Sequence, residues 1–356
     1  MESRKTSSHI QSWLVERLPF LPALSKFLSE KTVPRHKYSF FYLFGGMVLF
    51  LLFIQLITGT LLALYYSPYP EAANESVRFI MTSVNFGWLV RSLHVWGANA
   101  IVVVVLIHMA STFFMRAYRR PRELVWMSGV VAFFLVLGFA FTGYLLPWDT
   151  TAYFATQIGT EIPKSFPVIG TFVVALLRGG EDIGHEALKR MHAIHTIILP
   201  ITSLIFIVFH VILQQFVGTS APPVYAGRTG TIRFYPNYIY RDGIAWLLVG
   251  IALLGLSTML PAGLGARVDP LASAPVGIKP EWYFLPLYQT LRMFPTSVFS
   301  MSGEMIVNIL VAIASTALLL VPFIDNKSGM ISKSVVTLGI VAIAYYAGTI
   351  LLAYLI

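Results

Sequence analysis

The segment Arg91-Ser-Leu-His94-Val-Trp-Gly97 opens a long apolar run that contains a second histidine, His108. The segment Arg190-Met-His-Ala-Ile-His195-Thr-Ile-Ile-Leu-Pro200 opens another such run, which contains His210. The histidines are 14 residues apart in the first run and 15 in the second. Both intervals are about four helical turns, so each pair shares a helix face over roughly 21 to 22 Å of axis. Two such helices facing each other would offer two stacked His–His sites, one near each side of a membrane, which suits two haems.

The composition is that of a multi-span membrane protein. Hydrophobic residues make up 56% of the chain, charged residues only 12%, and the mean hydropathy is +0.73. Several apolar stretches reach the roughly 20 residues that a helix needs to cross a bilayer. The net charge of +9 falls in the loops between these stretches, where it sets orientation, so we expect no nucleic-acid partner. The absence of cysteine excludes disulfides, thiolate ligands and thioether attachment of haem to this chain.

The pattern predicts an all-α membrane protein with seven transmembrane helices. We expect these helices at residues 39–66, 87–116, 124–146, 191–217, 243–261, 303–323 and 334–355. The predicted parts are an N-terminal surface segment (1–38), a four-helix di-haem domain (39–217), a connecting loop (218–242) and a three-helix domain (243–356).

Two segments outside these spans carry further predictions. Residues 9–30 place apolar side chains at helical spacing and predict an amphipathic helix on the membrane surface, with a disordered tail as the alternative. That stripe consists of Ile10, Trp13, Leu14, Leu18, Leu21 and Leu24. The loop between the third and fourth spans is long and poor in charge, so we expect it to contain short helices and to form part of a site.

Lysine and arginine decide the orientation. Threading seven spans places four basic segments on one side of the membrane, and the opposite loops are poorer in positive charge. The basic residues are Lys31, Arg35, Lys37, Arg116, Arg119, Arg120, Arg122, Arg228, Arg233, Arg241, Lys327 and Lys333. We therefore expect a cytoplasmic N-terminus in a prokaryotic plasma membrane. His94 and His195 then lie level near the face opposite the basic loops, which is the electrically positive side of the membrane. His108 and His210 lie level near the cytoplasmic, electrically negative side.

Four imidazoles inside apolar spans indicate function, because ionisable groups are costly in hydrocarbon. Zinc or copper would need a third ligand, and the one candidate, His192, is displaced by nearly a turn. We interpret His192 as an interfacial residue near a quinone entrance. Four glycines repeat the histidine interval on the flanking spans, which predicts one glycine at each haem edge, with ordinary helix packing as the alternative. They are Gly45, Gly59, Gly129 and Gly143.

Seven motifs spread over nearly the whole chain resemble those of a known family. They are Gln55-Leu-Ile-Thr-Gly59, Gly87-Trp-Leu-Val-Arg91-Ser-Leu-His94, Pro121-Arg-Glu-Leu-Val-Trp126, Gly143-Tyr-Leu-Leu-Pro-Trp148-Asp149, Leu176-Leu-Arg-Gly-Gly180, His195-Thr-Ile-Ile-Leu-Pro200 and Pro280-Glu281-Trp282-Tyr283. They are similar to those of the cytochrome b of quinol-oxidising bc and bf complexes. The last is that family's quinol-site signature.

Within that family, the 15-residue interval and the seven spans resemble the photosynthetic bf branch. There, a four-helix cytochrome and a three-helix subunit IV are normally separate chains, and here both appear joined. The junction is mixed, because Phe234-Tyr-Pro-Asn-Tyr-Ile-Tyr-Arg241-Asp242 looks more like the respiratory branch. Leu43 replaces the cysteine that holds the bf branch's covalent haem, so that haem cannot form, and a non-covalent one stays open. Ser111 and Gln215 replace a propionate-binding arginine and a respiratory quinone-site histidine.

The resemblance implies quinol oxidation on the positive side, electron transfer through two non-covalent b haems, quinone reduction on the negative side and a proton gradient. It implies that Glu281 accepts a quinol proton in the Pro280–Tyr283 segment, where Trp282 also lies and Tyr283 gates the proton path. Arg91 would bind a propionate of the positive-side haem, with an interfacial snorkelling arginine as the alternative. At the other haem, the propionate charge would be neutralised by Arg116, Arg119 or the Arg35/Lys37 pair. Proton delivery to the negative-side quinone would rely on Arg241 and Asp242.

The implied partners are a Rieske-type iron–sulfur protein, a c-type cytochrome, and a second copy of the complex in a homodimer. The chain would be active only with these partners. The sequence leaves open the quinone, the acceptor cytochrome and the other subunits. Two other classes are a two-haem membrane anchor of a dehydrogenase and a transporter whose histidines relay protons. Neither class needs the Pro280–Tyr283 motif.

Overall fold

A computed structural model describes residues 13, 15–166, 169–225, 227–325 and 333–355. Within these residues it contains seven helices that are long and apolar enough to cross a membrane, which confirms the predicted all-α membrane fold. They are α3 (Leu43–Ala63), α5 (Gly87–Phe114), α6 (Glu123–Tyr144), α10 (Leu199–Val217), α11 (Ile239–Met259), α13 (Gly303–Ile324) and α14 (Lys333–Leu355).

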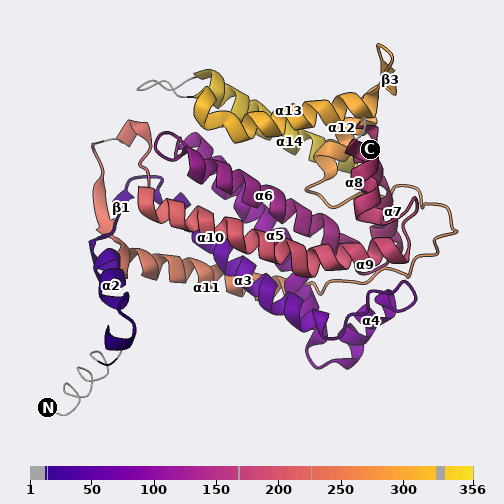
Figure 1. Ribbon diagram of the computed structural model, residues 1–356, viewed down its shortest axis with the longest axis horizontal. Helices are drawn as coiled ribbons and strands as arrows, with labels where there is room; N and C mark the ends of the chain where they lie inside the picture. The colour runs from indigo at the N-terminus through magenta and orange to yellow at the C-terminus, as the bar shows by residue number, and fades with distance from the viewer. Residues whose placement is uncertain (1–12, 14, 167–168, 226, 326–332, 356) are drawn as a thin grey trace.

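The seven long helices run side by side in one elongated bundle (Figure 1). Helix α3 packs along α5, and α6 packs along α10, so that two helix pairs form the four-helix centre. Helix α11 lies against α3 and α5, and α13 lies against α6. The side chains of these helices are apolar around their whole circumference, because they face either a neighbouring helix or lipid.

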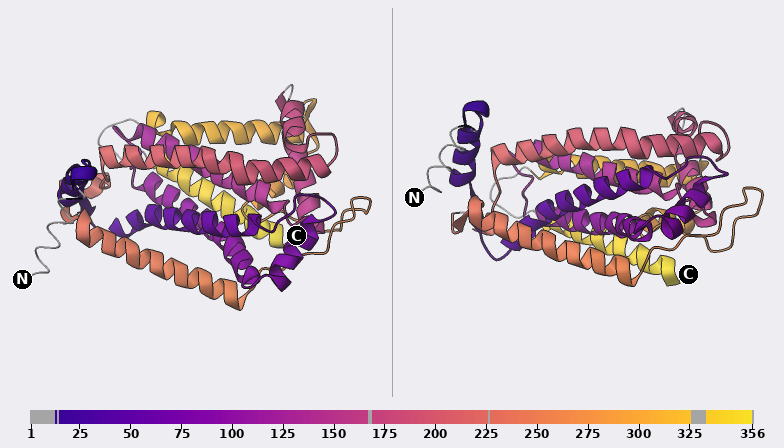
Figure 2. Two further views of the ribbon diagram at one scale, coloured as in Figure 1. Left: turned by 60° about the horizontal axis from the view of Figure 1, so that its bottom comes forward. Right: turned by 90° about the horizontal axis from the view of Figure 1, so that it is seen from below.

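Short elements gather at the two ends of the bundle (Figures 1 and 2). At one end lie the short helices α4 (Ala73–Ser83), α7 (Thr150–Glu161), α8 (Ile169–Arg178), α9 (His185–Ala193) and α12 (Leu285–Met293), together with the hairpin of β3 (Ser297–Val298) and β4 (Met301–Ser302). Two of these helices, α7 and α8, belong to the long loop between the third and fourth spans, whereas α9 continues into α10 as one span. The prediction of short helices in that loop is therefore correct.

The opposite end of the bundle carries the N-terminal segment. Strand β1 (Thr32–Arg35) pairs antiparallel with β2 (Gly230–Arg233), which ties this segment to the loop that follows α10. Helix α2 (Leu21–Glu30) lies across the ends of the long helices (Figure 2), as a helix on the membrane surface would. Ile10 and Leu14, which belong to the predicted amphipathic stripe, lie outside the described residues.

A buried ionic cluster joins the C-terminal helices to the central bundle at this end. Asp325, at the end of α13, is only 2% exposed and lies 3.3 Å from Arg116 and 3.1 Å from Arg119. The Tyr118 hydroxyl donates to the same carboxylate at 2.6 Å. Nearby, the Trp126 indole donates to the carbonyl of Leu318 at 2.8 Å. The loop between α5 and α6 therefore holds α13 in place through a buried charge.

Candidate functional site

The two histidines predicted near the positive side face each other. The ring centres of His94 on α5 and His195 lie 6.3 Å apart, and the ring planes are inclined by 73°. Two metal–nitrogen bonds of about 2 Å and two ring radii of about 1.1 Å would span this distance, so one metal ion fits between the two rings. The ring-centre distance between His94 and His195 is therefore compatible with a single metal ion between them, and ligation of iron by this pair stays a prediction.

A local irregularity positions His195. Residues Ile194–Ile198 form a single π-helical turn between α9 and α10, and Pro200 stands in the first turn of α10. Proline has no N–H to donate to the preceding turn, which favours a departure from α-helical hydrogen bonding there. Such π turns are frequent at functional sites because they re-aim a side chain.

Hydroxyl groups on the neighbouring helices contact three of the four histidines. The Nδ1 of His94 lies 2.9 Å from Thr58 Oγ1, and the Nδ1 of His195 lies 3.1 Å from Thr142 Oγ1. The Nδ1 of His210 lies 3.0 Å from Ser128 Oγ and 2.9 Å from the Val125 carbonyl. Each ring thus keeps Nε2 available as a metal ligand, with its other nitrogen held by the protein. The sequence analysis missed these three hydroxyl residues.

The four repeated glycines lie against the histidine rings. A Cβ added at Gly59 would stand 3.1 Å from His94 Cε1, and one at Gly143 would stand 2.6 Å from His195 Cε1. The corresponding distances are 3.3 Å from Gly45 to His108 and 3.0 Å from Gly129 to His210. The glycines therefore let each imidazole pack against a facing backbone. Gly59 and Gly45 lie toward opposite ends of α3, so His94 and His108 contact α3 near its two ends. This agrees with the prediction that the two histidines lie at different depths. A contact with a haem edge stays a prediction.

Arg91 and His192 both have protein partners at the end of the bundle that carries α4 and α9. The Arg91 guanidinium is buried and donates to the carbonyls of Ala262 at 2.7 Å and Gly263 at 2.9 Å. Its assignment to a haem propionate stays a prediction, and the structure gives it a second task, which is to hold the loop after α11. The His192 ring stacks on Tyr66, with ring centres 5.3 Å apart.

The Pro280–Tyr283 segment reaches into the side of the four-helix centre. The Trp282 indole donates to the side-chain oxygen of Asn99 at 2.8 Å, and the buried Tyr283 packs with residues of α3, α5 and α6. Glu281 is half-buried, and burial raises the pKa of its carboxyl above the usual value. Burial also raises the pKa of the Tyr283 hydroxyl, and the negative charge of Glu281 adds to that effect.

The long loop between α6 and α10 packs onto the residues that lead to this segment. The Thr150 amide donates to the Ala266 carbonyl at 3.0 Å, and Asp149 caps α7 by accepting from the Ala152 amide at 2.9 Å. Trp148 is fully buried in a cluster with Tyr153, against which Ile278 packs. The long loop and the Glu281 segment thus belong to one assembly at the same end of the bundle, as expected of a loop that forms part of a site.

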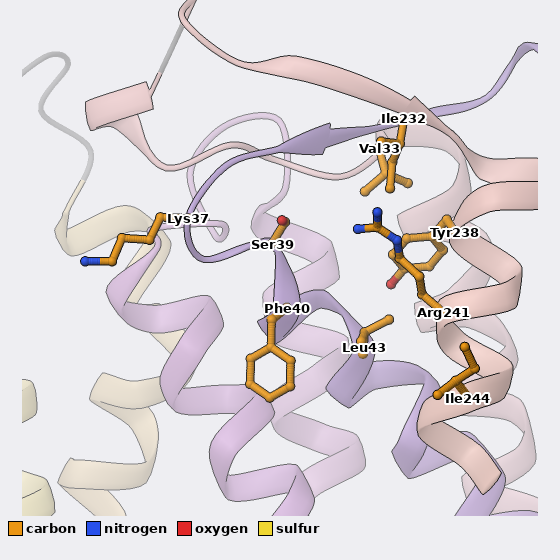
Figure 3. Close-up of a pocket in the computed structure, with 9 residues that line it drawn as sticks. All are labelled: Val33, Lys37, Ser39, Phe40, Leu43, Ile232, Tyr238, Arg241 and Ile244. Atoms are coloured by element: carbon orange, nitrogen blue, oxygen red, sulfur yellow. The ribbon is translucent and has the colours of Figure 1, made fainter. Parts of the chain in front are cut away.

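A pocket of about 340 Å³ opens at the other end of the bundle, between β1, β2, α3 and α11 (Figure 3). Its lining combines Arg241, Lys37, Tyr238 and Ser39 with five apolar side chains, Val33, Phe40, Leu43, Ile232 and Ile244. Figure 3 shows the Lys37 side chain directed away from the other lining residues. Leu43, which stands where the bf branch has a cysteine, is therefore a wall of this pocket.

Asp242 follows Arg241 on α11 and turns toward α3. Its carboxylate occupies the space that a Cβ on Gly46 would need, and its Oδ1 is buried without a hydrogen-bond partner among the described residues. Lys31 donates to the side-chain oxygen of Gln215 nearby in the same end of the bundle. Arg116, the candidate propionate partner, instead contacts Asp325 as described above.

Comparisons with known proteins agree with this architecture. The family described as "Cytochrome b/b6/petB" matches residues 28–218, and "Cytochrome b(C-terminal)/b6/petD" matches residues 267–355. The chain is 45% identical over 341 residues to the "Cytochrome bc complex cytochrome b subunit" of Chlorobaculum thiosulfatiphilum, covering 94% of this chain and 78% of that protein. It is 41% identical to "Cytochrome b6" of Heliobacterium mobile over 59% of this chain and 99% of that protein.

A solved structure titled "Hyperthermophilic respiratory Complex III" contains a chain with the same fold. The TM-score is 0.80 at 26% identity, and the match covers 96% of both chains. The two family matches and the similarities to two relatives all concern cytochrome b proteins, which favours this family over a dehydrogenase anchor or a proton-relay transporter. The protein belongs to the cytochrome b/b6 family, as one polypeptide that joins a b6-like part to a C-terminal, subunit IV-like part.

Proposed function

We propose that this chain is the di-haem subunit of a quinol:cytochrome c oxidoreductase of bc or bf type. The observation that carries the proposal is the pair of imidazoles, His94 and His195, held 6.3 Å apart inside the membrane-spanning bundle. Residues 39–217 would form the di-haem domain, residues 218–242 the connection and residues 243–356 the domain that completes the quinol site.

His94 and His195 would hold one haem b, and His108 and His210 the second, both without covalent attachment because the chain has no cysteine. When bound, the two haems supply one-electron carriers near the two sides of the membrane. The donor set supports this assignment, because paired neutral imidazoles with a free Nε2 are ligands that iron accepts. The glycine at each ring provides the close approach between helices that such a site needs.

On the positive side, Glu281 would accept a proton from bound quinol. Its half-buried position and raised pKa suit a general base better than those of a fully hydrated carboxylate. The hydrogen bond from Trp282 to Asn99 fixes the segment to α5, and the buried Tyr283 lines the proton path beside Glu281. The long loop above this segment would exclude water from the reacting quinol.

On the negative side, the pocket beside Arg241 would bind the quinone that is reduced. The Arg241 guanidinium and the Tyr238 hydroxyl can hydrogen-bond to quinone oxygens, and the apolar walls suit a ring with a hydrocarbon tail. Asp242 is a buried carboxylate next to this pocket and could pass protons to it. Protons released on one side and taken up on the other would contribute to a gradient.

The proposed setting is a multi-pass position in a prokaryotic plasma membrane, with the N-terminus on the negative, cytoplasmic side. A Rieske-type iron–sulfur protein and a c-type cytochrome would take the electrons that leave on the positive side. The complex would be a homodimer. The basic residues at the α2 end of the bundle, among them Arg119 and Arg122, support this orientation.

The test is the haem content of the intact complex in single-histidine variants. Reduced-minus-oxidised spectra of the wild type should show two bis-imidazole b haems. His94→Leu and His210→Leu should each lose one of them, whereas His192→Leu, which removes an imidazole beside the same helix, should keep both. Two haems in either ligand variant, or none in the wild type, would contradict the proposal.

A further inference from the structure

Three of the four histidines meet the same dipeptide on the facing helix, a hydroxyl residue followed by glycine. Thr58-Gly59 meets His94, Thr142-Gly143 meets His195, and Ser128-Gly129 meets His210. In each case the glycine makes room for the ring and the preceding hydroxyl oxygen lies at hydrogen-bond distance from Nδ1. The same dipeptide thus recurs three times on two different helices. The Nδ1 of His210 also lies 2.9 Å from the Val125 carbonyl, and His195 also has a backbone hydrogen bond to Phe139, so these two rings share their N–H between a hydroxyl and a carbonyl.

The direction of these hydrogen bonds follows from the second bond that each hydroxyl makes. Thr58 Oγ1 donates to the Ile54 carbonyl at 2.8 Å, and Thr142 Oγ1 donates to the Gly138 carbonyl at 2.8 Å. Ser128 Oγ donates to the Val125 carbonyl at 3.0 Å. A hydroxyl has one proton, so each oxygen is left to accept from the imidazole. The Nδ1 of all three rings therefore carries the proton, and Nε2 has the free lone pair.

The fourth histidine lacks this partner. The dipeptide that meets His108 is Phe44-Gly45, and the phenyl ring of Phe44 packs against Phe40 and Phe41 instead. The Nδ1 of His108 is buried and has no hydrogen-bond partner among the described residues. The positive-side pair thus has two hydrogen-bonded imidazoles, and the negative-side pair has one.

We propose that Thr58, Thr142 and Ser128 are positioning residues, each of which lowers the midpoint potential of the haem whose ligand it holds, and that Phe44 withholds the corresponding hydrogen bond from His108. An imidazole that donates from Nδ1 is a more basic ligand, and a more basic ligand stabilises ferric over ferrous iron. The inference rests on the proposed function.

The experiment is a redox titration of both haems in the intact complex, with each haem assigned through the single-histidine variants. Thr142→Val keeps the shape of the side chain and removes the hydroxyl. It should raise the potential of the positive-side haem by the equivalent of about a tenfold change in its reduction equilibrium, about 59 mV for one electron. Thr142→Ser should restore the wild-type value, and the other haem should not move.

The converse variant adds the missing hydroxyl. Phe44→Ser should lower the potential of the negative-side haem relative to Phe44→Ala, which leaves the same space without a hydroxyl. Equal potentials in these two variants, or equal shifts in Thr142→Val and Thr142→Ser, would overturn the inference. If Thr142→Val fails to assemble, the Phe44 pair decides alone. A wild type without two haems would refute the proposed function, whereas two haems with unmoved potentials would refute only this inference.

Discussion

Gly143→Ala should remove the positive-side haem and leave the negative-side haem in place. The added Cβ would lie 2.6 Å from His195 Cε1 and 3.0 Å from its Nδ1. Because carbon atoms pack at about 3.5 to 4.0 Å, the imidazole would have to move by about 1 Å. Ligand positions must hold to within about 0.5 Å to work, so this displacement exceeds what the site tolerates. The ring also bonds to Thr142, which restricts its movement.

Gly45→Ala is the matched control for this prediction. There the added Cβ would stand 3.3 Å from His108 Cε1, so a shift of a few tenths of an ångström accommodates it. The assay is the molar ratio of extractable haem to protein in the purified complex, together with the reduced-minus-oxidised spectrum. We expect about half of the wild-type haem in Gly143→Ala and a smaller loss in Gly45→Ala, because the added Cβ has more room there. Full haem content with an unchanged spectrum in Gly143→Ala would refute the steric argument.

Three further predictions concern the two quinone sites and the ionic cluster. Glu281→Gln should slow quinol oxidation without changing the haem content. Because a base must be ionised to accept a proton, wild-type turnover should fall as the pH drops below the raised pKa of the Glu281 carboxyl. A pH profile of turnover that stays flat would contradict this role. Asp242→Asn should slow re-oxidation of the haems by added quinone while leaving their reduction by quinol intact, and equal slowing of both would count against it. Asp325→Asn should lower the free energy of unfolding by about 3 kcal/mol, seen as a lower thermal midpoint of the complex, because it removes the buried carboxylate that Arg116 contacts. Glu75→Gln removes one partner of an exposed ion pair and should change the free energy of unfolding by less than about 1 kcal/mol.

The spans and the histidine levels could be predicted from the sequence because each depends on a local property. A helix that crosses a bilayer must satisfy its own backbone hydrogen bonds and present apolar side chains over about 20 residues. Both requirements depend only on residues that are consecutive in the sequence. The seven predicted spans accordingly correspond to the seven observed helices. The interval between His94 and His108 acts within one helix, so helical geometry alone puts both on one face.

The partners of individual side chains could not be predicted, because they lie on helices distant in the sequence. Thr58 on α3 contacts His94 on the neighbouring helix α5. In the sequence, Thr58 by itself looks like any other threonine of a membrane span. The carbonyls that Arg91 binds are more than 170 residues further along the chain. A repeated hydroxyl–glycine dipeptide was the one signal that could have pointed to these contacts.

The sequence by itself determined which segments cross the membrane, which histidines share a helix face and which end of each helix carries the basic loops. The tertiary structure alone decided that the ring centres of His94 and His195 lie 6.3 Å apart and that three of the rings contact a hydroxyl. It also decided that the Nδ1 of His108 has no such partner within the part of the chain that the structure describes. The physical reason is that periodicity acts along one helix, whereas rotation and spacing of facing helices follow from how all their side chains pack together. The spacing of the histidines predicted two sites, and only the packing showed that the two sites differ in the hydrogen bonds of their histidines.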